Sequence, residues 1–321
     1  MPITLAEAKV GMADKVDQAV VDSFRRSSLL LDLLVFDNSI APGTGGSTLT
    51  YGYLQLKTPS TAARRTVNSE YVAGEAKKEK KTADCAIMGG KFQLDRVIIG
   101  RAGAADELAF QANQKIKATS NLFHYLVING DSTASTGNSD FDGLSKLLKG
   151  TQNEFTSTID ISTAAKIDSS GQALLDEIDA LVASLDGKAT ALLMNRDMLT
   201  KIRGIARRAG YYERSEDSFG RPVETFNGIP MINLEQFFNG TQSVDVIPTT
   251  AGKTDIYAVR IGLDGFLGFS PEGNKLINSY MPDLTLPGAV KDGEVELIAG
   301  VALKNTKAAA VLRGVQIKEA K

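Results

Sequence analysis

Residues 104–128 read AADELAFQANQKIKATSNLFHYLVI and form the most strongly patterned stretch of the chain. The apolar positions in it are Leu108, Ala112, Ile116, Thr119, Phe123, Leu126 and Val127. They recur every three or four residues, as one face of an α-helix requires. Asp106 and Glu107 stand in the first turn, where the helix dipole favours negative charge. The pattern predicts one helix about 37 Å long, at 1.5 Å per residue.

Two strand-like segments precede this helix and enclose a long polar excursion. Residues 49–56, LTYGYLQL, alternate between apolar and polar positions, and residues 84–99 return to a strand-like pattern. The residues between them, 57–82, contain no apolar run. Excursions of this length inside compact domains are usually functional or mobile. We therefore expect a strand, a polar excursion and a second strand.

The charges of the excursion are unbalanced. Between Lys57 and Arg101 there are ten basic and five acidic residues, so this segment carries +5. The whole chain has 36 basic and 38 acidic residues and a net charge of −2, which leaves −7 for the remainder. A basic excursion on an acidic body complements another copy of the same chain. The alternative is a solvated loop whose lysines only keep it soluble.

Residues 3–35 are expected to form an amphipathic helix. Thr4 and Glu7 have the spacing of a capping box. The apolar stripe behind them comprises Val16, Val20, Phe24 and Leu31, joined by Leu30, Leu33 and Leu34. Such a stripe needs a surface to lie against. Two interpretations stay open: the helix packs on its own domain, or it is an arm that reaches a neighbouring subunit.

The second half of the chain mixes helices and strands without a strict repeat. Helical spacing is found over 172–186 and about 197–207, and strand patterns over 189–194, after Asn227, and within 255–269 and 294–317. Strands at both ends with helices between them predict an α+β fold.

A second basic cluster follows the predicted helix at 197–207. It comprises Lys201, Arg203, Arg207, Arg208 and Arg214, with Tyr211 and Tyr212 beside it. Basic and aromatic residues together can bind nucleic acid, but three acidic residues follow within the same loop. We weigh a contact between subunits first, a plain loop second and nucleic acid last.

The composition excludes most metal and nucleophilic chemistry. One His, one Cys and no Trp cannot build a two-His zinc site, a cysteine cage or an internal disulfide. We interpret His124 as a packing or surface residue and Cys85 as inert. Carboxylate pairs remain, but Asp176, Glu177 and Asp179 are expected on a solvated helix face. We predict no catalytic residue, no cofactor and no metal.

Two partial motifs fail on single positions. Gly252-Lys-Thr254 lacks the first glycine of a phosphate-binding loop, because Ile247 stands there. Residues 138–143 begin like a calcium-binding loop, but Lys149 occupies the place of the final glutamate. No stretch approaches 18 uninterrupted apolar residues and the N-terminus lacks a signal-peptide pattern, so we expect neither a membrane span nor secretion.

Taken in order, these features resemble the major capsid proteins of tailed bacteriophages, which have the HK97-type fold. SSLLLDLLVF, residues 27–36, is similar to the end of the family's N-arm, and residues 49–98 with their basic tip are similar to its E-loop hairpin. Residues 104–128, followed by INGD and FDGL, resemble the spine helix of the P domain. ATALLMNRDMLTKI, GYY and FNGIPMI resemble the A-domain series. No long charged N-terminal extension that could act as a fused scaffold is visible.

The resemblance implies a division of the chain and a set of contacts between subunits. The implied units are an N-terminal arm (1–42), the E-loop hairpin with flanking strands (43–98), a P domain with the spine helix (99–150), a mainly A-domain region (151–254) and return strands to the P domain (255–321). The implied contacts are Arg64, Arg65, Lys77, Lys78, Lys80 and Lys81 in the E-loop, Phe24, Leu30, Leu33 and Leu34 in the N-arm, and Arg207, Arg208, Tyr211 and Tyr212 at the capsomer centre.

The resemblance also implies a structural function without catalysis. The chain would self-assemble into pentamers and hexamers of an icosahedral shell around double-stranded phage DNA, which it would hold without sequence specificity. Its partners would be a portal protein, a separate scaffolding protein and a decoration protein, with no membrane. It would be found in the virion, and in the host cytoplasm during assembly. Two alternatives are the shell of an encapsulin-like bacterial nanocompartment and, in a different class, a carboxylate-dependent hydrolase.

Overall fold

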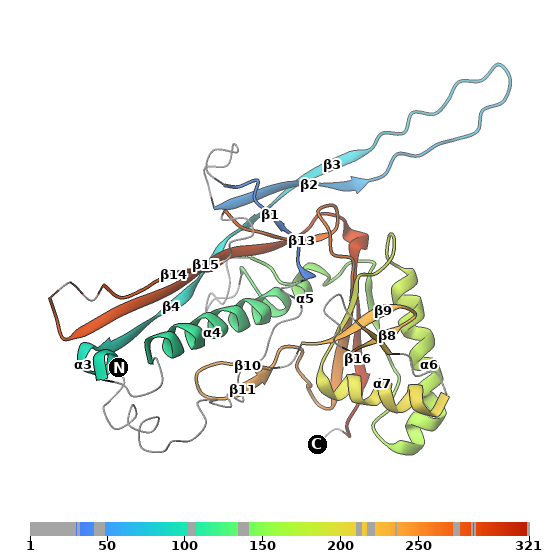
Figure 1. The fold of residues 1–321 in the computed structure, drawn as a ribbon. Coiled ribbons are helices and arrows are strands. Elements are labelled where there is room, and N and C mark those ends of the chain that lie inside the picture. The colour runs from blue at the N-terminus through green and yellow to red at the C-terminus, as the bar shows by residue number, and fades with distance from the viewer. Residues whose placement is uncertain are drawn as a thin grey trace.

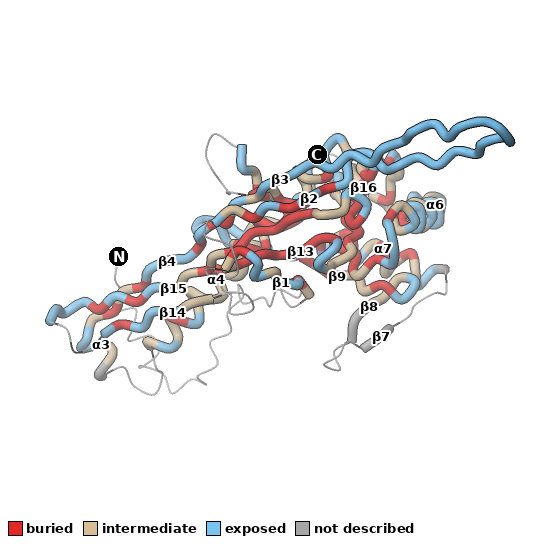
Figure 2. The backbone as a smooth tube through the Cα atoms, turned by 90° about the horizontal axis from the view of Figure 1, so that it is seen from above, coloured by how far each residue is buried: buried red, intermediate tan, exposed pale blue. Residues whose placement is uncertain are grey.

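The computed structural model shows an elongated body, a compact body and a long hairpin that projects away from both (Figure 1). It describes residues 30, 33–41, 49–101, 107–133, 141–209, 214–216, 222–234, 236–271, 277–283, 285 and 287–319. Buried residues run through both bodies, whereas the outer part of the hairpin is exposed along its whole length (Figure 2). Among the described helices, none is both long and apolar enough to cross a membrane.

A five-stranded sheet forms the elongated body. Its central strand, β15 (Val290–Leu303), pairs antiparallel with β4 (Ala86–Asp95) over ten residue pairs. The remaining strands are β14 (Ile277–Tyr280), β13 (Phe266–Phe269) and β1 (Phe36–Asp37). Buried and exposed residues alternate along the first half of β15. One face of this sheet is therefore covered and the other faces solvent.

Helix α4 (Glu107–Asn129) covers the inner face of this sheet, against β4 and β15. Its buried side chains include Ala112, Thr119 and Phe123, which follow the helical repeat. The long helix predicted at 104–128 is confirmed for the part that the structure describes. Two short helices flank it: α3 (Arg96–Arg101), directly after β4, and α5 (Leu144–Leu147).

A seven-stranded sheet forms the compact body. Its strands, in spatial order, are β5 (Glu154–Thr156), β16 (Ala309–Gln316), β12 (Lys253–Val259), β6 (Ala191–Met194), β9 (Ile229–Asn233), β8 (Pro222–Phe226) and β7 (Arg214–Glu216). Helices α6 (Ala164–Ala183) and α7 (Arg196–Ala209) pack on one face around Ile178, Met198 and Ile202. The other face shares a core with α4. A short 3-10 helix, η1 (Thr306–Ala308), precedes β16.

Asparagines make two of the turns in the compact body. The side chain of Asn195 accepts a hydrogen bond of 2.8 Å from the backbone N–H of Met198 and so caps the start of α7. Asn227 and Gly228 both have positive φ, 49° and 72°, and join β8 to β9. Such φ values are typical of two-residue hairpin turns, for which Asn-Gly is the preferred sequence.

The projecting hairpin consists of β2 (Thr50–Thr58) and β3 (Lys77–Asp84), paired antiparallel. A second, short hairpin of β10 (Gln236–Phe238) and β11 (Ser243–Asp245) lies beside α4.

Two expectations need correction. The segment 84–99 was expected to form one strand, but β4 ends at Asp95 and α3 follows. The partner of the strand at 49–56 is β3, which lies in the stretch without an apolar run, whereas β4 pairs with β15 in another sheet.

Residues 255–321 contribute strands to both sheets, because β12 and β16 are central strands of the compact body. The α+β class is confirmed.

Candidate assembly surfaces

One tyrosine fixes the base of the projecting hairpin to the elongated body. The Tyr51 side chain is 3% exposed and its ring stacks on Phe269, with 4.8 Å between the ring centroids. Its hydroxyl donates a hydrogen bond of 2.7 Å to Asp37, whose carboxylate also lies 3.6 Å from Lys304 Nζ. Burial raises the pKa of Tyr51 far above its usual value, and the bond to Asp37 raises it further. Tyr51 therefore remains a hydrogen-bond donor, and the hairpin leaves the body in a fixed direction.

The outer part of the hairpin has no such support. Every residue from 56 to 82 is exposed. Three large apolar side chains lie at the tip: Val67, Tyr71 and Val72 are 88%, 65% and 81% exposed. The guanidinium of Arg65 lies 5.3 Å from the centroid of the Tyr71 ring and donates to the Ser69 carbonyl. The tip therefore exposes three apolar side chains to solvent.

The six basic residues predicted as E-loop contacts all lie on the exposed part of this hairpin. Arg64 and Arg65 are at the tip, and Lys77, Lys78, Lys80 and Lys81 are on β3. The structure thus brings them together on one arm, as the sequence predicts.

The register of the hairpin divides these residues between its faces. Lys80 pairs with Leu54 and Lys78 with Leu56, so the four side chains share one face. Leu54 is 64% exposed and Leu56 is 55% exposed. Neither lysine forms an ion pair with another described residue. We call these four residues the basic face; it combines two uncompensated cations with apolar surface.

A row of acidic side chains lies on the solvent-facing side of the elongated sheet. Asp292, Glu294 and Glu296 occupy alternate positions of β15, opposite the face that α4 covers. Lys91 forms an ion pair of 2.8 Å with Asp292. Glu294 and Glu296 form none with another described residue, and Tyr280, paired with Glu294, is 55% exposed. We call the three carboxylates the acidic row.

The residues predicted as N-arm contacts pack against their own chain where the structure describes them. Leu30 and Leu34 are 0% and 5% exposed and belong to the core around α4. Leu33 is partly buried against the same core. Phe24 lies outside the described residues. The burial of Leu30 and Leu34 does not require a neighbouring subunit.

Two of the residues predicted for the capsomer centre, Arg207 and Arg208, lie at the end of α7. Arg207 and Arg208 are exposed there, whereas Tyr211 and Tyr212 lie outside the described residues. Arg208 Nη1 donates a hydrogen bond of 2.7 Å to Asp168 of α6. Arg207 forms no ion pair with another described residue, so it is the more available of the two cations.

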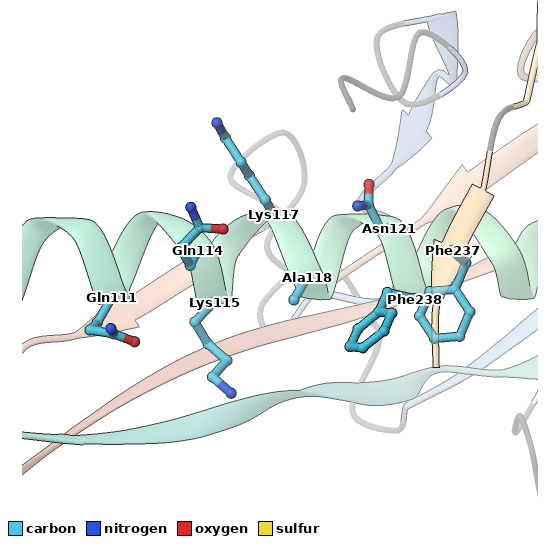
Figure 3. A pocket seen from close by; sticks show the side chains of 8 residues that line it. All are labelled: Gln111, Gln114, Lys115, Lys117, Ala118, Asn121, Phe237 and Phe238. Carbon is cyan, nitrogen blue, oxygen red and sulfur yellow. The ribbon is translucent and has the colours of Figure 1, made fainter. Parts of the chain in front are cut away.

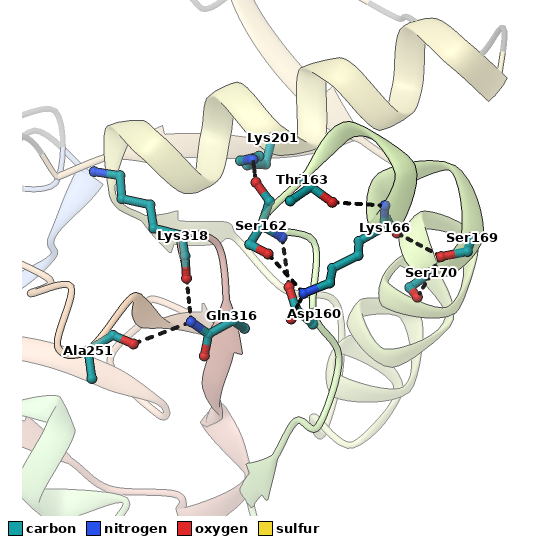
Figure 4. Close-up of polar contacts among 10 residues, drawn as sticks. All are labelled: Asp160, Ser162, Thr163, Lys166, Ser169, Ser170, Lys201, Ala251, Gln316 and Lys318. Carbon is teal, nitrogen blue, oxygen red and sulfur yellow. Dashed lines mark hydrogen bonds and ion pairs between the residues drawn. The ribbon is translucent and has the colours of Figure 1, made fainter. Parts of the chain in front are cut away.

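A polar network holds the start of α6 against α7 (Figure 4). Lys201 Nζ donates a hydrogen bond of 2.8 Å to the Ser162 carbonyl, and Lys166 Nζ lies 2.6 Å from Asp160. The hydrogen bond from Lys166 lowers the pKa of Asp160 to about 2. Lys201, which the sequence places in the second basic cluster, therefore holds the two helices together.

The carboxylates considered for catalysis do not converge. Asp176 is exposed, Glu177 accepts a hydrogen bond of 2.6 Å from Ser157, and Asp179 accepts one of 2.8 Å from Asn227. No group of three His, Cys, Asp or Glu residues with metal-binding geometry occurs among the described residues. Glu177 and Asp179 therefore connect α6 to neighbouring segments of the compact body.

The single histidine is a packing residue. His124 is 6% exposed, and its Nε2 has no hydrogen-bond partner within the described part of the chain. Burial lowers the pKa of His124 to about 4. The imidazole is therefore neutral at pH 7.

The comparisons with solved structures identify the fold of this architecture. No protein-family model matches the sequence, and no curated protein matches it either. Among solved structures, the holo-SrpI encapsulin complex from Synechococcus elongatus PCC 7942 aligns with all of this chain and 99% of its own, at a TM-score of 0.65 and 15% identity. The chain therefore has the HK97-type capsid fold.

Two capsids give similar alignments. The capsid of a native GTA particle has a TM-score of 0.61 and 13% identity, and covers 94% of this chain and 95% of its own. The capsid of Myoviridae phage XM1 has a TM-score of 0.60 and 16% identity, and covers 98% of this chain and 99% of its own. Phage capsids and an encapsulin thus share the fold over nearly the whole chain, and the resemblance seen in the sequence is confirmed at the level of fold.

Proposed function

We propose that this chain is a major capsid protein that self-assembles into pentamers and hexamers of an icosahedral phage head around double-stranded DNA. The fold supports a shell-forming protein, because its structural neighbours are shells. The observation that carries the proposal is that each chain presents both the basic face and the acidic row. The two surfaces have opposite charge, and each also exposes apolar side chains.

On this proposal the two surfaces meet between subunits. Figure 1 shows the hairpin and the end of the elongated sheet that bears the acidic row extending in opposite directions. The hairpin of one subunit would lie across the solvent-facing side of its neighbour's sheet. Lys78 and Lys80 would pair with Glu294 and Glu296, while Leu54 and Leu56 would lose their exposed apolar area. Arg64 and Arg65 at the tip would extend this contact.

The proposal also assigns the domains. The elongated sheet with α4 would be the P domain, the compact body would be the A domain, and the hairpin would be the E-loop. Arg207 at the end of α7 would face the capsomer axis, together with Arg208 and the tyrosines that follow. A portal protein, a separate scaffolding protein and a decoration protein would complete the head, which assembles in the host cytoplasm and persists in the virion.

Reversing charge on one side of the contact tests this mechanism. Lys78→Glu with Lys80→Glu should give folded, soluble protein that no longer forms shells at the concentration at which the wild type assembles. Exposed ion pairs are worth up to about 1 kcal/mol each, so the concentration needed for assembly should rise roughly tenfold. Sizing chromatography and negative-stain imaging measure this. Lys188→Glu with Lys253→Glu, on exposed lysines of the compact body, is the matched control.

The second reversal makes the test specific. Glu294→Lys with Glu296→Lys should also block assembly, and combining all four substitutions in one chain should restore it. Normal shells from the lysine variant would contradict the charge pairing. Failure of the combined variant to recover would show that the two surfaces do not meet. A wild-type protein that stays a 34.2 kDa monomer would contradict the shell itself and favour the hydrolase alternative.

An encapsulin-like nanocompartment is the second candidate, because an encapsulin aligns with the full length of the chain. The two candidates differ in what the particle encloses. Purified particles should contain DNA that resists added nuclease. Particles that instead co-purify with a stoichiometric enzyme and no protected nucleic acid would favour the compartment.

A further inference from the structure

The chain contains three Asn-Gly dipeptides, and the structure describes all of them: Asn129-Gly130, Asn227-Gly228 and Asn239-Gly240. In such a pair the backbone nitrogen of glycine can attack the preceding side-chain amide, because glycine has no side chain to hinder it. The reaction turns asparagine into an aspartyl residue. Its rate in a folded protein depends on how the asparagine side chain and the glycine N–H are held, and the three pairs differ in both.

Asn239 lies in the turn of the hairpin formed by β10 and β11, and its side chain bends back over its own backbone. Its Oδ1 accepts hydrogen bonds of 3.0 Å from the Thr241 N–H and 2.9 Å from the Gln242 N–H. The bond from Thr241 closes a ring that includes the Gly240 nitrogen, so the side-chain carbonyl is held beside that nitrogen. The Gly240 N–H donates to no acceptor among the described residues. Asn239 and Gly240 are exposed, so water and hydroxide reach both.

The strands on either side keep this turn in place. β10 and β11 form three residue pairs, and the Asn239 N–H donates a hydrogen bond of 3.1 Å to the Gln242 carbonyl. Figure 3 shows Phe237 and Phe238 of β10 beside α4, and the Phe237 ring stacks on Tyr125 of α4 with 5.1 Å between the centroids. The side-chain carbonyl and its two donors are therefore ordered before any reaction begins.

Asn129 is held in a way that opposes the same reaction. At the end of α4, its Nδ2 donates to the Tyr125 and Val246 carbonyls, at 3.3 Å and 2.6 Å. The Gly130 N–H donates a helical hydrogen bond of 2.7 Å to the Leu126 carbonyl, and Gly130 is buried. An attack by the Gly130 nitrogen would break that bond and turn the amide away from both carbonyls.

Asn227 is exposed, but its side chain is bound to another element. Its Nδ2 donates a hydrogen bond of 2.8 Å to Asp179 of α6, and no backbone N–H among the described residues donates to its Oδ1. Its φ of 49° belongs to the two-residue turn that the pair Phe226–Ile229 closes. An attack by the Gly228 nitrogen would break the bond to Asp179, and no donor would stabilise the negative charge that forms on Oδ1.

We propose that Asn239 is a self-modification site, at which the Gly240 nitrogen converts the side-chain amide into an aspartyl or isoaspartyl carboxylate. Hydroxide takes the proton of the Gly240 N–H, and the nitrogen attacks Cγ of Asn239. The new N–Cγ bond moves an electron pair onto Oδ1, where the Thr241 and Gln242 N–H groups stabilise the negative charge. The Cγ–Nδ2 bond then breaks, and Nδ2 leaves as ammonia with a proton from water. A cyclic imide remains.

Water completes the reaction and leaves a carboxylate at the turn. It adds to one of the two imide carbonyls, giving aspartate when Cγ is attacked and isoaspartate when the backbone carbon is attacked. The chain, whose net charge is −2, gains an additional negative charge. In isoaspartate the main chain runs through the side-chain carbons, so the turn is longer and the bonds from Thr241 and Gln242 to Oδ1 are lost. The hairpin beside α4 therefore accumulates this change as the protein ages.

Peptide mapping of the full-length protein tests this proposal. The folded protein is incubated at mildly alkaline pH and digested at intervals, and chromatography with mass spectrometry separates asparaginyl, aspartyl and isoaspartyl peptides. Asn239 should be modified at least roughly tenfold faster than Asn227 or Asn129, because only its side chain is held for attack. In urea the three rates should converge, since each site is then an unstructured Asn-Gly pair. Equal rates in the folded protein, or the same ranking in urea, would overturn the proposal.

A backbone variant tests the donors to Oδ1. Thr241→Pro removes the N–H that donates at 3.0 Å and should slow the modification of Asn239 roughly tenfold, with the rates at Asn227 and Asn129 unchanged. Thr241→Ser keeps the backbone N–H and is the matched control, and circular dichroism establishes that both variants are folded. An unchanged or faster rate in the proline variant, or equal slowing in the serine variant, would contradict the role of these donors. None of these outcomes depends on whether shells form.

Discussion

The base and the tip of the projecting hairpin belong to the same two-stranded element but have opposite environments. At the base, Tyr51 is buried, stacked and hydrogen-bonded. At the tip, Tyr71 is 65% exposed, and the Arg65 guanidinium of the same loop lies over its ring. The base is stabilised by its own chain. The tip exposes apolar side chains that another surface can cover, and we assign that surface to a neighbouring subunit.

The largest effect on stability is expected at the base. Tyr51→Ala removes an aromatic ring from a packed cluster and should lower the free energy of unfolding by about 3–5 kcal/mol. Urea denaturation followed by fluorescence or circular dichroism measures it. Tyr51→Phe is the control: it keeps the stack on Phe269 and loses only the bond to Asp37, worth about 1 kcal/mol. A small effect of the alanine variant would show that the base is not locked by this side chain.

A smaller, pH-dependent effect is expected in the core of the elongated body. The folded-state pKa of His124 is about 4, below its ordinary value of about 6.5. The unfolded chain therefore binds the proton more readily, and stability falls as pH drops below about 6.5. Between pH 7.5 and pH 5 this loss should be about 2 kcal/mol.

Comparing denaturation at these two pH values with a His124→Leu variant isolates the effect. The variant should lose most of this pH dependence, because the depressed carboxyl pKa values in the protein matter only at lower pH. An unchanged pH dependence in the variant would assign the effect to other groups and show that His124 does not titrate in this way.

The presence or absence of a local apolar repeat explains which elements could be predicted from the sequence. The α4 helix has a strong apolar repeat, so its position was predictable. Strand β3, KKEKKTAD, has none. It is a strand because it pairs with β2, whose alternate residues are anchored in the body. Strand preference depends on such neighbours far more than helix preference does. The sequence pattern therefore missed β3 and indicated β4 as the second strand instead.

The candidate site shows the same limit. The basic residues of the hairpin could be found from charge alone. The acidic row could not be found in this way, because the sequence does not show which face of β15 is covered by α4. Its alternation with Val295 and Leu297 is visible in DGEVEL, and that signal could have predicted a half-exposed strand with an acidic face. The packing of α4 on the opposite face decides that these carboxylates stay exposed to solvent, and no local sequence pattern contains that packing.

The smallest effect on stability is expected at the tip. Tyr71→Ala with Val72→Ala should change the free energy of unfolding by less than about 0.5 kcal/mol, because these side chains are exposed. Burying such side chains on assembly is worth about 1.5–3 kcal/mol each, so the same variant should assemble at least tenfold less readily by light scattering. Leu263→Ala, at an exposed leucine away from the hairpin, should affect neither measurement. A stability loss comparable to that of Tyr51→Ala would mean that the tip supports its own chain, and unchanged assembly would mean that no neighbour covers it.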